Sequence, residues 1–109
     1  MNITEHVDGI LRYVSVEPIN FDPNEHYPTI VLLHGFGSNM GDLASMCHNI
    51  DSSKYVYICP NAPIPMDIGF GATIGYAWMI PPEGSPKSLH AIQNTLTSFI
   101  QEISATRNV

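Results

Sequence analysis

The chain has 109 residues, of which 44% are hydrophobic, and its ten acidic and four basic residues give a formal net charge of −6. This length allows one modest domain, the apolar fraction argues against disorder, and the lack of any lysine or arginine cluster excludes nucleic acid as an expected partner. No apolar run is long enough to span a membrane and no secretory signal pattern is present, so we expect a cytoplasmic protein.

The first predicted elements are strands. Residues 11–17 alternate apolar and polar side chains, which predicts a half-buried strand that is antiparallel to a neighbour. Residues 18–28 are polar and rich in turn formers, and we expect a loop there. Residues 29–33 form a continuous apolar run, which is typical of a central strand buried on both faces.

A short helix is predicted next, with Asn39 as its N-cap and Asp42 in its first turn. Its apolar face would comprise Met40, Leu43, Met46 or Cys47, and Ile50. Residues 55–59 form a second candidate for a buried strand, which ends at Pro60. A strand, a helix and a strand over this length predict one right-handed βαβ crossover in a parallel sheet.

The second half of the chain contains a long loop and a long helix. Residues 60–82 carry several glycines and prolines and the single tryptophan, and loops of this length are usually functional. Ser85 and Pro86 suit the N-cap and the first position of an amphipathic helix of about 20 residues. Its apolar face would comprise Leu89, Ile92, Leu96, Phe99 or Ile100, and Ile103. Together these elements predict an α/β fold with a mostly parallel sheet and flanking helices.

The two cysteines, Cys47 and Cys59, fall in the predicted short helix and at the end of a predicted strand. Neither has a histidine at metal-ligand spacing, so we expect both to be buried as small apolar residues. The sequence indicates no metal and no organic cofactor.

The motif His34-Gly35-Phe36-Gly37, between an apolar strand and a helix, indicates a chemical role. A strand and loop of this kind supply half of the oxyanion hole in α/β-hydrolases, where backbone N–H groups stabilise the tetrahedral intermediate of acyl transfer. The two glycines lack Cβ atoms and allow a sharp turn close to a substrate. We predict the N–H of Phe36 as the donor, the N–H of Gly37 as the second choice, and the Phe36 ring as part of the acyl pocket.

The glycine spacing of residues 35–41 also occurs in dinucleotide-binding turns. Such a site requires a carboxylate for the ribose about 20 residues on, at the end of the next strand. Here that strand ends in Cys59-Pro60, so we reject dinucleotide binding.

Three blocks in order, residues 33–43, 59–63 and 76–78, resemble the phospholipase/carboxylesterase family of α/β-hydrolases, which includes acyl-protein thioesterase-like serine esterases. The resemblance implies that Phe36 and Gly37 lie in the oxyanion hole and that His34 holds this loop through hydrogen bonds. It also implies a substrate site bordered by Trp78 and Met79. The predicted substrate-binding set is His34, Phe36, Trp78 and Met79. After Trp78 the family usually has an aromatic residue and an aspartate, where this chain has Met79 and Ile80.

No Gly-x-Ser-x-Gly motif occurs in the sequence, and the resemblance places the serine, aspartate and histidine of the triad after Val109. Residues 1–109 are therefore predicted to form the N-terminal part of an α/β-hydrolase domain, inactive until a C-terminal part completes it. The predicted activity is that of a serine carboxylesterase or lysophospholipase-like enzyme. Its ester substrate would be acyl or aryl, because the loop side chains are apolar: Phe36, Ile68, Phe70, Trp78 and Met79.

The alternative is a non-catalytic, truncated hydrolase-fold module that acts in binding or assembly. Two predicted strands of central type without outer neighbours would leave an exposed sheet edge. Such a module could self-associate through this edge.

Overall fold

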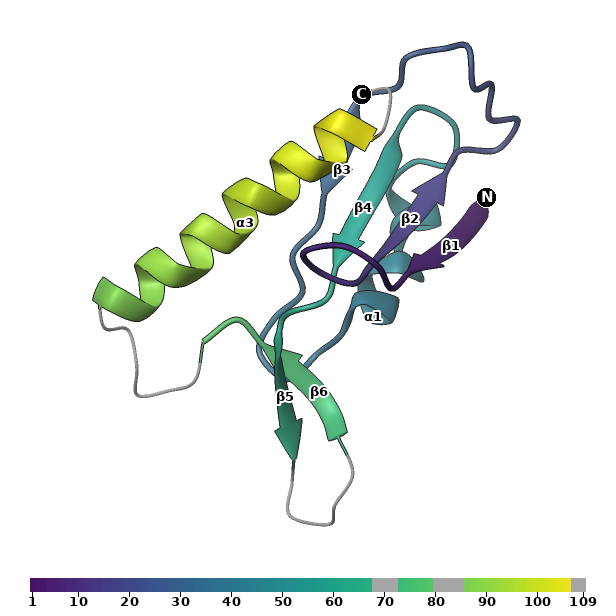
Figure 1. The fold of residues 1–109 in the computed structure, drawn as a ribbon. Helices are drawn as coiled ribbons and strands as arrows, with labels where there is room; N and C mark the ends of the chain where they lie inside the picture. Colours follow the sequence, from purple (N-terminus) through teal and green to yellow (C-terminus); the bar gives the residue numbers. More distant parts are fainter. Residues whose placement is uncertain (68–72, 80–85, 107–109) are drawn as a thin grey trace.

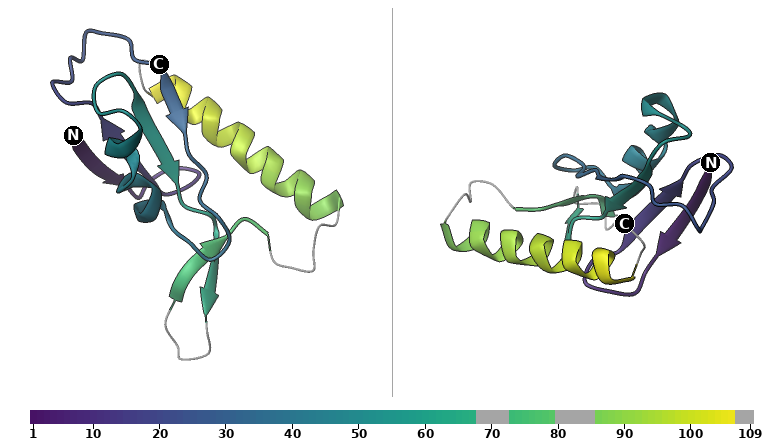
Figure 2. Two further views of the ribbon diagram at one scale, coloured as in Figure 1. Left: turned by 180° about the vertical axis from the view of Figure 1, so that it is seen from behind. Right: turned by 90° about the horizontal axis from the view of Figure 1, so that it is seen from above.

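A computed structural model describes residues 1–67, 73–79 and 86–106 of the chain. A sheet lies between short helices on one face and a long helix on the other, and a two-stranded hairpin projects from one end (Figures 1 and 2). The elements in chain order are β1 (Asn2–His6), β2 (Tyr13–Glu17), β3 (Thr29–Val31), α1 (Met40–Ala44), α2 (Cys47–Ile50), β4 (Val56–Pro60), β5 (Ile64–Asp67), β6 (Thr73–Ala77) and α3 (Pro86–Thr106). No helix in these ranges has the length and apolar character that crossing a membrane requires.

The four-stranded sheet has the order β1-β2-β4-β3, and it is mixed. β2 pairs antiparallel with both β1 and β4, whereas β3 pairs parallel with β4. The expectation of a mostly parallel sheet is therefore not confirmed for the described residues. The physical reason is connection length: the few residues between β1 and β2 permit only an antiparallel pair, and one crossover, through α1 and α2, joins β3 to β4.

The environments of β2 and β3 differ from the predicted ones. β2 is antiparallel to its neighbours, as predicted, but residues 13–16 are all buried. The polar residue that suggested an exposed face, Ser15, is buried with its hydroxyl 2.8 Å from Nε2 of His6, which satisfies its hydrogen bonding. β3 is shorter than predicted and half-buried, because among the described residues it has a neighbour on one side only.

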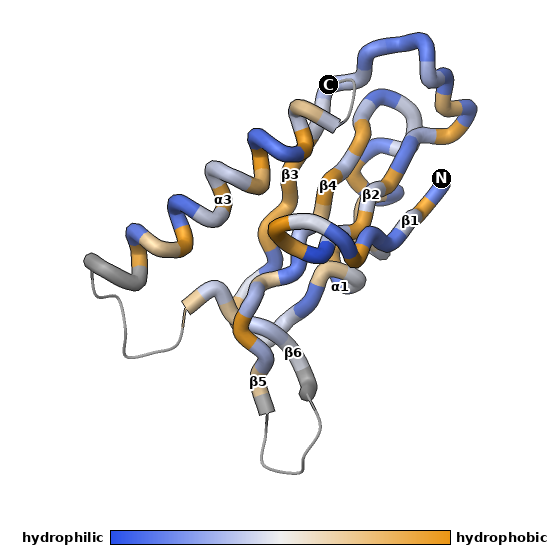
Figure 3. Tube along the Cα trace, viewed as in Figure 1, coloured by the Kyte–Doolittle hydropathy of each residue, from blue (hydrophilic) through white to orange (hydrophobic). Residues whose placement is uncertain are grey.

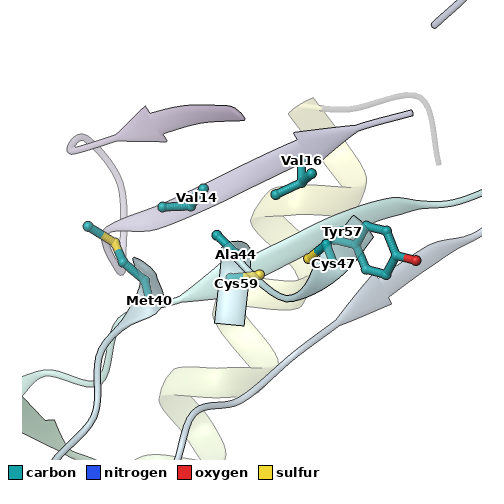
Figure 4. Close-up of a cluster of buried hydrophobic side chains, with 7 residues drawn as sticks. All are labelled: Val14, Val16, Met40, Ala44, Cys47, Tyr57 and Cys59. Carbon is teal, nitrogen blue, oxygen red and sulfur yellow. The ribbon is translucent and has the colours of Figure 1, made fainter. Parts of the chain in front are cut away.

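The predicted short helix is two helices, α1 and α2, which pack on one face of the sheet. The Asn39 side chain accepts a hydrogen bond from the Asp42 N–H at 3.0 Å, so the predicted N-cap is confirmed. Figure 4 shows the apolar cluster beneath these helices, formed by Val14, Val16, Met40, Ala44, Cys47, Tyr57 and Cys59. Of the alternatives Met46 and Cys47, Cys47 is the buried residue. Ile50 is exposed instead of buried, because the chain turns at residues 45–46 and changes the face that α2 presents. Both cysteines are buried and free, as predicted.

The long helix α3 covers the opposite face of the sheet. Its buried residues Phe99 and Ile103 pack with a second apolar cluster that includes Tyr13, Val56 and Ile58. In Figure 3, apolar positions gather on the central strands and alternate with polar ones along α3. The predicted helix is confirmed, with Phe99 rather than Ile100 in the core. The predicted N-cap, Ser85, lies outside the described residues.

The predicted long loop over residues 60–82 contains a hairpin, so that part of the prediction is wrong. β5 and β6 pair antiparallel, with an irregularity between Met66 and Asp67. Pro65 is tolerated because a two-stranded ribbon consists of edge strands, where the missing N–H can face solvent. The prolines and glycines that suggested a loop are therefore compatible with this short hairpin.

Candidate functional site

The candidate site is built on the loop of residues 34–38, hereafter the 34–38 loop, which links β3 to α1. The N–H of Leu32 donates to the Ile58 carbonyl at 2.9 Å, so parallel pairing continues just beyond β3 before the chain leaves the sheet. The loop thus lies where the carboxyl ends of the parallel pair β3 and β4 meet. In open α/β sheets this edge is the usual place for ligands.

His34 is 3% exposed, and both of its ring nitrogens face backbone groups. Nδ1 lies 2.8 Å from the Gly35 carbonyl oxygen, and Nε2 lies 3.0 Å from the Ala62 N–H. A carbonyl can only accept and an amide N–H can only donate, so the imidazole is neutral with its proton on Nδ1. The prediction that His34 holds the loop through hydrogen bonds is confirmed. The His34 ring is buried against protein groups, whereas the sequence predicts this residue in the substrate-binding set.

Gly37 has a φ of +80°, a conformation that glycine adopts readily and other residues rarely do. Its N–H donates to the Tyr76 carbonyl at 2.9 Å, and the Tyr76 N–H donates to the Ser38 carbonyl at 2.8 Å. The loop therefore pairs with β6 as a short antiparallel bridge. Gly35, in contrast, has no positive φ and open space around its Cα, so only Gly37 needs glycine for its backbone conformation.

The two predicted oxyanion donors are not equivalent. The Gly37 N–H is engaged by Tyr76, whereas the Phe36 N–H has no acceptor within the part of the chain that the structure describes. The Phe36 side chain is 58% exposed. Phe36 therefore presents both an available donor and an apolar ring at the tip of the 34–38 loop.

Trp78 lies against the start of the same loop. Its indole Nε1–H donates to the His34 carbonyl at 2.9 Å, and the two rings are 5.4 Å apart between centroids. Trp78 and the following Met79 are half-buried. The structure thus places Trp78 in contact with His34, which lies two residues before Phe36 in the chain. Ile68 and Phe70, predicted to line the substrate site, lie outside the described residues.

Asn61, for which the sequence analysis found no role, fastens the region behind the loop. It is buried, its Oδ1 accepts the Met40 N–H at 3.0 Å, and its own N–H donates to the Arg12 carbonyl at 2.8 Å. These contacts tie the start of α1 to the end of β4 and the start of β2. The sequence signal for Asn61 is its position, because it is a polar residue that directly follows the buried strand β4, which ends at Pro60.

A pocket of about 310 Å³ is lined in part by residues at the start of α1 and on β6. The Arg12 guanidinium lines it and lies 3.1 Å from the Glu5 carboxylate. Hydrogen bonds to Glu5 and Tyr76 raise the pKa of Arg12, so this group stays charged. Within residues 1–67, 73–79 and 86–106, no group of three or more histidine, cysteine or acidic side chains could hold a metal ion.

Two solved structures resemble the fold. Both are of the CE1 ferulic acid esterase AmCE1/Fae1A from the anaerobic fungus Anaeromyces mucronatus. The structure without substrate superposes with a TM-score of 0.53 at 12% identity, covering 99% of this chain and 44% of that one. The complex with ferulic acid has a TM-score of 0.52 at 11% identity, covering 98% and 43%. This chain therefore spans less than half the length of these esterases, and the likeness shows an α/β-hydrolase-like fold.

At the level of sequence, no curated protein matches the chain. The phospholipase/carboxylesterase family matches residues 16–106, which include the end of β2, all of β3 and β4, the 34–38 loop, the hairpin and α3. The match thus covers most of the chain, including the 34–38 loop and residues 75–78, which contact it. The chain belongs to the phospholipase/carboxylesterase family of α/β-hydrolases.

Proposed function

We propose that this chain is part of a carboxylic-ester hydrolase and that the N–H of Phe36 is one donor of its oxyanion hole. The observation that carries the proposal is the unequal use of the loop amides. The N–H groups of Gly37 and Ser38 donate within the protein, whereas the Phe36 N–H has no acceptor among the described residues. The N–H groups of His34 and Gly35 also lack an acceptor among the described residues, and we choose that of Phe36 because of its place in the motif. A positioned N–H without an internal acceptor is what electrostatic stabilisation of an oxyanion requires.

In the proposed reaction, a serine hydroxyl attacks the ester carbonyl and transfers its proton to a histidine base, and the carbonyl oxygen becomes an oxyanion. The Phe36 N–H would bind this oxygen together with the N–H of the residue after the nucleophile. The serine, the base and its orienting carboxylate would come from a part of the enzyme outside residues 1–109. The solved esterases, more than twice as long as this chain, support such an arrangement.

The substrate class follows from the side chains around the loop. Phe36 is exposed, and Trp78 and Met79 are half-buried. Trp78 contacts His34, which lies two residues before Phe36. Binding pockets lined by apolar and aromatic groups favour apolar ligands. We therefore propose an acyl or aryl ester as the substrate, with Phe36 and Met79 as the contacting side chains.

The first test is covalent labelling. The protein is purified through a tag placed before Met1, so that any polypeptide that continues or accompanies residues 1–109 is recovered with it. It is then treated with a fluorophosphonate and examined by denaturing mass spectrometry, with p-nitrophenyl butyrate hydrolysis as the activity assay. We expect the label on a serine outside residues 1–109, together with hydrolysis. A single unlabelled and inactive species with the mass of the tag plus the 12.0 kDa of residues 1–109 would favour the non-catalytic module instead.

The second test compares two glycine substitutions in the 34–38 loop. Gly37→Ala places a Cβ at a φ of +80°, which costs about 1–2 kcal/mol, and relaxation of the backbone would move the Phe36 N–H. Gly35→Ala is the matched control, because its Cβ would meet no atom within 4 Å. We expect kcat to fall about 10- to 100-fold in Gly37→Ala and less than about threefold in Gly35→Ala. Equal kcat values for the two variants would contradict the assignment.

A further inference from the structure

Residues 75–78, hereafter the 75–78 segment, contact the 34–38 loop at both of its ends. Tyr76 exchanges backbone hydrogen bonds with Gly37 and Ser38, and Trp78 donates its indole N–H to the His34 carbonyl. Between these anchor points only Gly35 and Phe36 remain. The segment belongs to β6 and its C-terminal continuation, so the hairpin that projects from the sheet in Figure 1 also reaches the candidate site.

We propose that the 75–78 segment positions the oxyanion donor, with Gly75 and Trp78 as positioning residues. The proposal rests on the function proposed above and adds to it: the hairpin determines where the Phe36 N–H lies. Trp78 acts through the His34 carbonyl and not by contact with the substrate. It thereby acquires a role different from the substrate wall that the sequence analysis predicted.

The first step of the argument concerns Gly75. An added Cβ at Gly75 would overlap the carbonyl group of Gly37, so β6 approaches the loop as closely as a backbone without a side chain allows. Gly75 is buried and has no positive φ, so conformational freedom does not explain the glycine here. Its absent side chain permits the two hydrogen bonds between Tyr76 and the loop.

The second step concerns Trp78. Its Nε1–H reaches the His34 carbonyl at 2.9 Å, while the His34 ring is held by the Gly35 carbonyl and the Ala62 N–H. The indole is half-buried and packs against the apolar cluster beneath α3. Trp78 therefore links the start of the 34–38 loop to the core, and the Tyr76 bridge holds its other end.

The two roles for Trp78 predict different kinetics. A substrate wall contributes to binding, so its loss changes KM and changes the preference among acyl lengths. A positioning residue sets the location of a donor that binds the transition state, so its loss lowers kcat and leaves KM unchanged. A transition-state analogue separates the roles further, because the tetrahedral adduct of a trifluoromethyl ketone places its oxyanion at the same donor.

The experiment compares Trp78→Phe, Gly75→Ala and the control Ser98→Ala in the protein purified as above. Phenylalanine retains an aromatic ring but has no N–H, and Ser98 is exposed on α3. Rates are normalised to active sites titrated with the fluorophosphonate, which removes any effect of unfolded protein. We expect Trp78→Phe to lower kcat about tenfold for acetyl, butyryl and octanoyl esters alike, as the loss of one hydrogen bond allows. Trifluoromethyl ketone affinity should fall by the same factor, with KM within about twofold.

Amide hydrogen exchange of the 34–38 loop tests the same inference without catalysis. Gly75→Ala and Trp78→Phe should accelerate exchange of the loop amides at least about tenfold, and Ser98→Ala should leave it unchanged. An active wild type whose two variants keep kcat, analogue affinity and loop exchange would overturn the positioning role alone. A wild type without label or activity would overturn the proposed hydrolase instead, and the exchange data would then decide whether the segment holds the loop.

Discussion

At the scale of single residues, the two thiols show how burial controls chemistry. Cys47 and Cys59 lie in the cluster between α1, α2 and the sheet, and neither has measurable exposure (Figure 4). Burial raises the pKa of both thiols, that of Cys59 to about 12, because the charged thiolate would lose its hydration. Cys47 and Cys59 are near the 34–38 loop in sequence, but their burial and raised pKa values argue against a nucleophilic role.

We predict that neither cysteine reacts in the native protein. At pH 8 only about 10⁻⁴ of the Cys59 thiols would be ionised, and the thiolate is the reactive form. Iodoacetamide treatment followed by peptide mass mapping should therefore leave peptides with Cys47 and Cys59 unmodified, and both should be modified in 6 M guanidinium chloride. Rapid native alkylation of Cys59 would show that the strand β4 is accessible to solvent.

At the scale of elements, α3 depends on one apolar face. Phe99 is fully buried and its ring meets that of Tyr13 edge to face, with 5.5 Å between centroids. The next residue, Ile100, is 47% exposed. Neighbouring residues on one helix thus differ strongly in their contribution to packing, and they form a matched pair for mutation.

Phe99→Ala should reduce the free energy of unfolding by about 3–5 kcal/mol, because it removes a buried ring and leaves a cavity. Ile100→Ala removes a half-exposed side chain and should cost less than about 1 kcal/mol. Urea denaturation followed by circular dichroism measures both values. A similar loss in the two variants would mean that α3 does not pack on the sheet through the Phe99 face.

The elements that could be predicted from sequence are those with strong local patterns. The 3.6-residue period defined α3, and the apolar runs defined β3 and β4 within one or two residues at most ends. β1 was missed because its residues are exposed and it depends on pairing with β2. The hairpin was missed because β5 and β6 are short and interrupted by proline and glycine, so their pairing leaves little local signal.

At the scale of the whole molecule, the candidate site combines segments that are far apart in sequence. The sequence motif of residues 34–37 was enough to identify the 34–38 loop with His34 and Phe36, because the motif consists of consecutive residues. Engagement of the Gly37 N–H could not be predicted, since its acceptor, Tyr76, lies on the hairpin and reaches the loop only in the fold. The roles of Gly75 and Asn61 depend in the same way on contacts between segments.

The same architecture predicts a gradient of local stability across the sheet. β4 is buried along its whole length between β2 and β3, and β2 is buried over residues 13–16, whereas β1 is largely exposed at one edge. Amides of central strands exchange only when most of the structure opens, while edge strands fray independently.

Hydrogen exchange with mass spectrometry should therefore show the slowest exchange in β2 and β4 and faster exchange in β1. The exchange rate of the β4 amides should increase with urea concentration as steeply as global unfolding does. The exchange rate of the β1 amides should hardly depend on urea. Slower exchange in β1 than in β4 would contradict the strand order, because an edge strand cannot outlast the strands against which it pairs.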